Sequence, residues 1–257
     1  MKTKLIFLFI FFCTISFAKE SPKELAEQTQ NIFSNLLRFS FQYDTIFPVG
    51  DYDKAQKAFQ FRALVPTNFD NWLLVSRLVV PYTWKPQYSQ SEPAQSGLLN
   101  SEMDFLFSPK SKNNTFWGIG PSIWLPTSSN EKIVAQTWAL GPMFGISKTW
   151  DSWVLSIVVK QLWSLSSEDI STFAFDYTIG YNFENGTYLT TSPSVSCDWE
   201  IQSGHQCMIP FGMGVGKVVW LKRIPIDFNL QGYYNVTTTI PNARWDIVLN
   251  LLLLFPK

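Results

Sequence analysis

The 257-residue chain has little charge, one histidine and three cysteines, and each shortage excludes a class of protein. Charged residues make up 16% of the chain, with Lys+Arg and Asp+Glu equal at 20 each, against about 25% charged residues in average globular proteins. A nucleic-acid binder needs a basic surplus to displace counterions from phosphates, so that class is excluded. One histidine with three cysteines argues against a zinc site. We therefore expect no metal, no cofactor and no nucleic-acid partner.

Long apolar runs are missing too. No segment after the N-terminus has 18 consecutive apolar residues, which argues against transmembrane helices. At the N-terminus, Lys2 and Lys4 precede an apolar run over residues 5–13, and residues 16–18 read Ser-Phe-Ala. This order is that of a secretory signal peptide, and the run is too short for a membrane anchor. We predict that residues 1–18 are cleaved and that the chain is exported.

Aromatic residues are abundant, and they recur with a period of two. The chain holds 11 Trp, 22 Phe and 9 Tyr. Apolar and polar residues alternate over residues 37–44, 172–183 and 245–255. Successive side chains of a strand point to opposite faces, so this period predicts strands with one apolar and one polar face.

About twelve such segments follow one another, each close to the ~9–11 residues that a tilted strand needs to cross a bilayer. They cover residues 36–46, 56–66, 72–84, 99–108, 115–126, 138–148, 153–164, 172–183, 187–196, 208–220, 225–236 and 244–255. An even number is typical of bacterial outer-membrane barrels. The fold class that we predict is all-β: a transmembrane antiparallel up-and-down barrel over residues 36–257.

The expected connections alternate in length. Those after the even-numbered strands are short, at residues 67–71, 109–114, 149–152, 184–186 and 221–224. Those after odd-numbered strands are mostly longer, at residues 47–55, 85–98, 127–137 and 197–207. Outer-membrane barrels have short periplasmic turns and longer extracellular loops. The pattern therefore predicts that both termini are periplasmic.

The rival interpretation is a soluble barrel or sandwich with its apolar face inside. Its polar face would be rich in Lys and Glu, whereas here that face carries mostly Ser, Thr, Gly, Asn and Gln. Aromatic residues near the strand ends also favour a membrane barrel, because such residues form girdles at the two interfaces. Pro121 and Pro142 fit poorly inside strands, and their glycine neighbours predict bulges or bends there.

The two cysteines left after cleavage, Cys197 and Cys207, predict a disulfide, since an exported chain with one even pair usually forms one. The single histidine, His205, lies within this loop. A hydrolase would need it to work with residues such as Ser203 and Asp198. Three such loop residues occur together by chance readily, so we assign no catalytic residue.

The strand charges predicted to face the lumen are the candidate functional residues. They are Arg38, Arg62, Arg77, Glu102, Asp104, Lys160, Asp176, Asp227, Arg244 and Asp246. One interpretation is a charged constriction that filters solutes, since pore-lining charge sets selectivity. The other is a structural lattice, in which Arg77 pairs with Asp104 and Asp44 pairs with Arg244. Twelve strands lie between filled eight-stranded barrels and open porins, so size leaves both possible.

The segment ahead of the first strand, residues 19–35, is expected to be periplasmic and to form a short amphipathic helix. Leu25, Ala26, Ile32, Phe33 and Leu36 are spaced for one helix face. The segment either leads into the first strand, which we favour, or plugs the periplasmic mouth of the barrel.

Several pieces of the chain resemble a known family. The most specific are FWGIGPSIWLPT (116–127) and ALGPMFGISK (139–148), with NLLRFSFQ (35–42), LLVSRLVVP (73–81), FLFSPK (105–110) and LLFPK (253–257). In order and spacing they resemble bacterial outer-membrane barrels labelled neuromedin-U-like, or transporters related to the phenol-degradation pathway. GLLNSE (97–102) departs from the Gly-Leu-Gly-Asp usual in that family, and the cysteine pair is not one of its features. The resemblance implies a barrel that passes small compounds, hydrophobic ones among them.

These observations predict a narrow outer-membrane channel for passive uptake or efflux of small solutes. Its expected partners are outer-membrane lipid, the solute, and the barrel-assembly machinery, which would bind the C-terminal strand. The alternative is a structural or adhesive barrel that works through its extracellular loops, and an outer-membrane hydrolase comes third. The expected location is the outer membrane of a Gram-negative cell.

Overall fold

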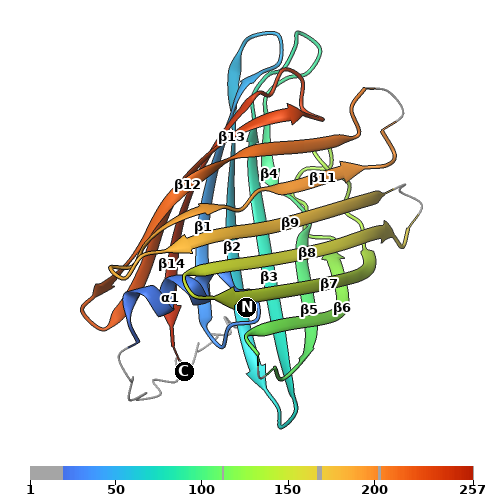
Figure 1. Ribbon diagram of the computed structural model, residues 1–257. Helices are drawn as coiled ribbons and strands as arrows, with labels where there is room; N and C mark the ends of the chain where they lie inside the picture. Colours follow the sequence, from blue (N-terminus) through green and yellow to red (C-terminus); the bar gives the residue numbers. More distant parts are fainter. Residues whose placement is uncertain (1–19, 112, 167–169, 202–203, 257) are drawn as a thin grey trace, which may run out of the picture.

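The chain forms one closed antiparallel β-barrel with a short helix at one end (Figure 1). The computed structural model describes residues 20–111, 113–166, 170–201 and 204–256. The predicted signal peptide, residues 1–18, lies outside the described residues.

Fourteen strands follow helix α1 (Pro22–Gln30). They are β1 (Leu37–Val49), β2 (Lys54–Asn68), β3 (Trp72–Lys85), β4 (Gln95–Leu98), β5 (Ser101–Pro109), β6 (Thr115–Leu125), β7 (Ala139–Trp150), β8 (Trp153–Ser164), β9 (Ser171–Asn182), β10 (Thr187–Thr191), β11 (Ser194–Asp198), β12 (Cys207–Leu221), β13 (Ile224–Thr237) and β14 (Trp245–Phe255). Both β4 and β5 pair with β3, and both β10 and β11 pair with β9 and β12. Each couple fills one position in the wall, so the barrel has the twelve positions that the sequence predicts.

The barrel closes where its first and last strands meet. β1 pairs with β14 over eleven residue pairs, from Leu37 opposite Phe255 to Phe47 opposite Trp245. Leu37 and Phe255 therefore lie at the same end of the barrel. We call this the turn end, because the tight connections lie there, and the opposite end the loop end.

The connections differ between the two ends as expected. Those at the turn end, such as residues 151–152 and 222–223, have two to five residues. The loop end carries longer ones, up to the thirteen residues 126–138. The first loop is shorter than predicted: β1 and β2 extend beyond the expected ends and leave only residues 50–53.

The outer wall is apolar and the inner wall polar, as the alternation predicts. Large apolar side chains are exposed all round the barrel, whereas soluble monomers rarely expose extended apolar patches. Exposed tryptophans stand at two levels. Near the turn end they are Trp72, Trp117, Trp150 and Trp153, and near the loop end Trp84, Trp138, Trp163 and Trp245. Two aromatic girdles around an apolar band are the surface of a barrel in a bilayer. None of the described helices is long and apolar enough to cross a membrane.

Pro121 and Pro142 lie opposite each other in the β6–β7 ladder. The β5–β6 ladder is interrupted beside Pro121, and the β7–β8 ladder beside Pro142. The register is the same on both sides of each gap. For example, Asp104 faces Ser122 and Phe107 faces Ile119. No residue is inserted, so the ladders open beside the prolines without a bulge.

Gly120, next to the gap in the β5–β6 ladder, allows two strands to approach closely, so a larger residue there should disturb folding. A Cβ at residue 120 would stand 1.7 Å from the carbonyl oxygen of Phe105, whereas one at Gly232 would meet nothing within 4 Å. We expect Gly120→Ala to reduce the folded fraction strongly and Gly232→Ala to leave it unchanged. Heat-modifiable migration in detergent gels measures that fraction, and equal behaviour of the two variants would contradict the packing described.

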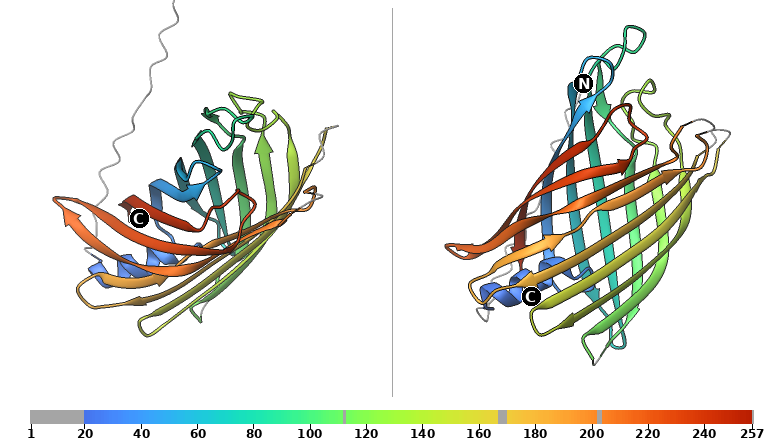
Figure 2. Two further views of the ribbon diagram at one scale, coloured as in Figure 1. Left: turned by 90° about the horizontal axis from the view of Figure 1, so that it is seen from above. Right: turned by 45° about the horizontal axis from the view of Figure 1, so that its top comes forward.

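Helix α1 begins with a complete capping box. Ser21 Oγ accepts a hydrogen bond from the Glu24 backbone N–H, and the Glu24 carboxylate accepts one from the Ser21 N–H. These bonds hold the pKa of Glu24 below its ordinary value. The helix ends at Gln30, earlier than the apolar spacing predicts, because Asn31 is extended. Figure 2 shows α1 lying across the turn end of the barrel.

Candidate functional site

The lumen holds a cavity of about 650 Å³, within the range of ligand pockets. Seven of the ten predicted lumen residues line it: Arg38, Arg62, Arg77, Glu102, Lys160, Asp176 and Asp246. Thr29, Gln30 and Ile32 of the N-terminal segment line it as well. The cavity is therefore bounded on the turn-end side by the segment that precedes β1.

The other three predicted residues lie elsewhere. Asp104 and Asp227 are 1% exposed and sealed within the inner wall. Asp227 accepts hydrogen bonds from the Tyr188 hydroxyl at 2.8 Å. Arg244 is exposed, lies just before β14 begins at Trp245 and is not among the residues that line the cavity. The expected pair with Asp44 is also absent, since Asp44 instead accepts hydrogen bonds from the Gln42 amide at 2.8 and 2.9 Å.

A network of buried charges crosses one side of the lumen. Arg77 Nη2 lies 2.6 Å from Asp104 Oδ2 and 3.3 Å from Glu102 Oε1, so the predicted pair across neighbouring strands is present. Glu102 also pairs with Lys160 and accepts a hydrogen bond from Trp124 Nε1 at 3.0 Å. This network neutralises two of the lumen cations.

Lys160 reaches Glu102 across two intervening strands. In the wall, β6 and β7 separate β5 from β8, and their inward residues at this level are Ser122 and Gly141. Small side chains leave room for the lysine to pass over them. The Glu102–Lys160 pair therefore links non-adjacent parts of the barrel wall.

Arg38 anchors the end of α1 to the barrel. Its Nη1 donates to the carbonyl oxygens of Gln28 at 2.9 Å and Thr29 at 2.5 Å, and its Nη2 donates to that of Asn31 at 3.5 Å. The last carbonyls of a helix have no partner within the helix, and cations are favoured there. The last turn of α1 contains no basic residue, so Arg38 of β1 supplies that cation.

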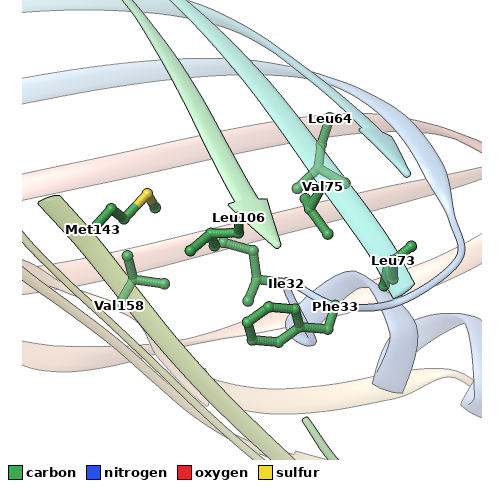
Figure 3. Close-up of a cluster of buried hydrophobic side chains, with 8 residues drawn as sticks. All are labelled: Ile32, Phe33, Leu64, Leu73, Val75, Leu106, Met143 and Val158. Atoms are coloured by element: carbon green, nitrogen blue, oxygen red, sulfur yellow. The ribbon is translucent and has the colours of Figure 1, made fainter. Parts of the chain in front are cut away.

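The residues after α1 fill the mouth of the barrel at its turn end. Phe33 is 2% exposed and Ile32 7% exposed. Figure 3 shows them among inward-facing apolar side chains of the wall. Those side chains are Leu64, Leu73, Val75, Leu106, Met143 and Val158, from β2, β3, β5, β7 and β8.

The other half of the mouth is filled by α1 itself. Leu25 and Ala26 are fully buried against apolar side chains that include Tyr188 and Val218. Gln30 Nε2 donates to Asn182 Oδ1 at 2.8 Å, and its side chain occupies the space over Gly180. Of the two alternatives for this segment, the structure therefore shows the plug, in place of the simple lead-in that we favoured.

Sequence reasoning missed the polar groups that complete the lumen. Asn250 donates to Asn229, whose amide oxygen also accepts from Gln231, so uncharged amides line the wall formed by β13 and β14. Trp124 was also missed. Strand parity could have found all of them, because Trp124 shares its face with Ser122, and the amides share theirs with Asp227 and Asp246.

The loop end carries the predicted disulfide. Cys197 and Cys207 are bonded and face each other across β11 and β12. His205 is exposed in the adjoining loop and has no hydrogen bond to any residue in the described ranges. Asp198 Oδ1 accepts from the Glu200 N–H instead, and Ser203 lies outside the described residues.

Comparison with known proteins agrees with this architecture. The family described as "Putative MetA-pathway of phenol degradation" matches residues 56–192, more than half of the chain. The crystal structure of the COG4313 outer membrane channel from Pseudomonas putida F1 superposes with a TM-score of 0.63 at 13% identity, over 86% of this chain and 94% of that one. The β domain of the Bordetella autotransporter BrkA gives 0.48 at 7% identity, over 86% and 100%. No curated protein matches the sequence significantly.

These matches settle the fold and the family. The phenol-degradation part of the resemblance is confirmed, and nothing supports the neuromedin-U-like label. The first superposition confirms the fold of an outer-membrane barrel. The chain therefore belongs to the family of the putative MetA pathway of phenol degradation.

Proposed function

We propose that the protein is an outer-membrane channel through which small solutes pass by diffusion. The observation that carries this proposal is a cavity of about 650 Å³, lined by charged and amide side chains among apolar ones, inside a barrel with an apolar outer wall. Buried polar groups are costly unless they face partners or water, so a polar lumen of this size is best explained by water and solute within it. The barrel from Pseudomonas putida F1 in the comparison above is itself described as an outer membrane channel, which supports the proposal.

The orientation that we propose follows from the connections. Outer-membrane barrels keep their short turns in the periplasm, so the turn end, with α1 and the C-terminal strand, would be periplasmic. The disulfide and the longer loops would then face the outside of the cell. In this orientation the apolar wall contacts lipid, and β14 is the strand offered to the barrel-assembly machinery.

The solutes that we propose are polar, in place of the hydrophobic compounds expected earlier. Gln42, Gln60, Asn229, Gln231 and Asn250 all line the cavity. An apolar solute would have to displace water from these amides without replacing its hydrogen bonds. We assign no catalytic role, because His205 is exposed in a loop and is not among the residues that line the cavity.

Planar-bilayer recording of the purified chain tests the proposal. We expect discrete current steps from samples whose folding is verified by heat-modifiable migration, and none from the same protein unfolded by boiling. A folded barrel that produces no steps at any salt concentration would overturn it. Deleting residues 198–206 should leave the current steps in place. If the barrel worked through its loops, the same deletion would abolish its surface binding.

A further inference from the structure

Three arginines gather around one residue on the inner wall. Leu64 of β2 lies opposite Arg38 of β1 and opposite Arg77 of β3. Arg62 lies two residues from Leu64 on the same strand, so it points to the same face, one step nearer the loop end. All three guanidinium groups are therefore close neighbours beside the cavity.

Two of these arginines already have strong partners. Arg77 forms ion pairs with Asp104 and Glu102, and Arg38 donates to three carbonyl oxygens at the end of α1. Both are therefore committed to holding the wall and the N-terminal segment in place.

Arg62 is different. Its Nε and Nη2 donate to a single acceptor, Gln60 Oε1, at 3.2 and 2.7 Å. A guanidinium carries five N–H donors, and Nη1 of Arg62 has no hydrogen-bond partner in the part of the chain that the structure describes. None of the ion pairs found there includes Arg62. It is thus a cation that faces the cavity with donors to spare.

Three carboxylates act on Arg62 only from a distance. Asp44, Asp176 and Glu102 attract its charge, but none of them lies within ion-pair distance of it. In the β1–β2 register, Asp44 stands opposite Ala58, four residues nearer the loop end than Arg62, and it is occupied by the Gln42 amide. Arg62 therefore faces the cavity with no carboxylate paired to it.

We propose that Arg62 forms an anion-binding site in the lumen cavity and that it receives the planar carboxylate of a small solute. A guanidinium matches a carboxylate through two parallel N–H···O bonds, a geometry that lysine cannot reproduce. Ser40 and Gln42, which line the cavity beside Arg62, offer neutral hydrogen bonds to the rest of the solute. The inference rests on the proposed channel function and gives its solutes a chemical class: small organic acids.

Isothermal titration calorimetry of the detergent-purified full-length chain tests the site, with benzoate as the probe and benzamide as its uncharged counterpart. We expect benzoate to bind the wild-type protein and benzamide to bind far more weakly. Arg62→Gln should weaken benzoate binding about tenfold or more, which is the effect of losing one charge-assisted pair. Arg62→Lys should weaken it less, because it keeps the charge and loses only the paired geometry.

The matched control is Arg223→Gln. Arg223 lies exposed in the tight turn between β12 and β13, so this variant removes the same charge away from the cavity and should bind benzoate like the wild type. Absence of benzoate binding to the wild type, or equal binding by the wild type and Arg62→Gln, would overturn the site. Equilibrium binding does not require passage through the barrel. A chain that binds benzoate but gives no current would refute the channel alone, and one that conducts but does not bind would refute the site alone.

Discussion

We expect a chain that lacks residues 22–33 to conduct severalfold more current than the full-length protein. The deleted residues include Leu25 and Ala26, which are fully buried, and Phe33, which is 2% exposed. Their removal takes away α1 and the side chains that fill the turn-end mouth, while every strand pairing of the wall remains. The cavity would then be open to water at both ends. Single-channel recording and liposome swelling with small sugars both measure this change.

A variant pair on the surface of the same segment serves as the control. Lys23 and Glu184 form an ion pair at 2.6 Å in which Glu184 is 86% exposed. Exposed pairs contribute little to stability, so Lys23→Gln with Glu184→Gln should leave the current unchanged. Equal currents from the full-length chain and the deletion, with both folded, would show that the segment does not obstruct the lumen.

Replacing Glu102 by glutamine should lower the free energy of unfolding by about 3 kcal/mol, at the lower end of the range for breaking a buried ion pair. Glu102 is 8% exposed, forms ion pairs with Arg77 and Lys160, and accepts a hydrogen bond from Trp124. The substitution keeps the shape of the side chain but leaves Lys160 without its carboxylate in a largely enclosed part of the wall. Urea unfolding in detergent, followed by tryptophan fluorescence, measures the loss.

The double variant Glu102→Gln with Lys160→Met separates loss of charge pairing from loss of packing. Removing both charges of a buried pair is often close to neutral, so the double variant should recover much of the stability lost by Glu102→Gln. If the single variant stays within about 0.5 kcal/mol of the wild type, the size of an ordinary surface substitution, the network has no stabilising role.

The strands could be predicted because their physics is local. A barrel in lipid needs one apolar and one polar face on every strand, so apolar and polar residues alternate along the sequence with a period of two. The segment predicted over residues 172–183 is strand Ser171–Asn182, and the one over 244–255 is Trp245–Phe255. The Arg77–Asp104 pair could be predicted as well, since adjacent strands place the two residues opposite each other.

What could not be predicted depends on contacts across the lumen. The spacing of Leu25, Ala26 and Phe33 gives one apolar face, but it does not say which surface covers that face. Three glycines of the wall mark the surface that the segment covers. A side chain at Gly180 would collide with Gln30, and one at Gly118 or Gly145 would crowd the Phe33 ring. Such gaps are recognised only once the wall is built. The Glu102–Lys160 pair is similar, because two strands separate its members.

A disulfide that locks the N-terminal segment to the wall tests the proposed passage of solutes through the lumen most directly. The variant Gln30→Cys with Gly180→Cys places one cysteine in the N-terminal segment and the other on β9, where the Gln30 side chain lies over Gly180 in the wild type. Because residues 25–33 fill the turn-end mouth, solutes can pass only after this segment has moved, so we expect no current steps from the oxidised variant. Reductant should restore the steps, while the same reductant leaves the wild type conducting. Equal currents from the oxidised and reduced variant, with the crosslink verified, would contradict the inference that the N-terminal segment must move away before solutes pass.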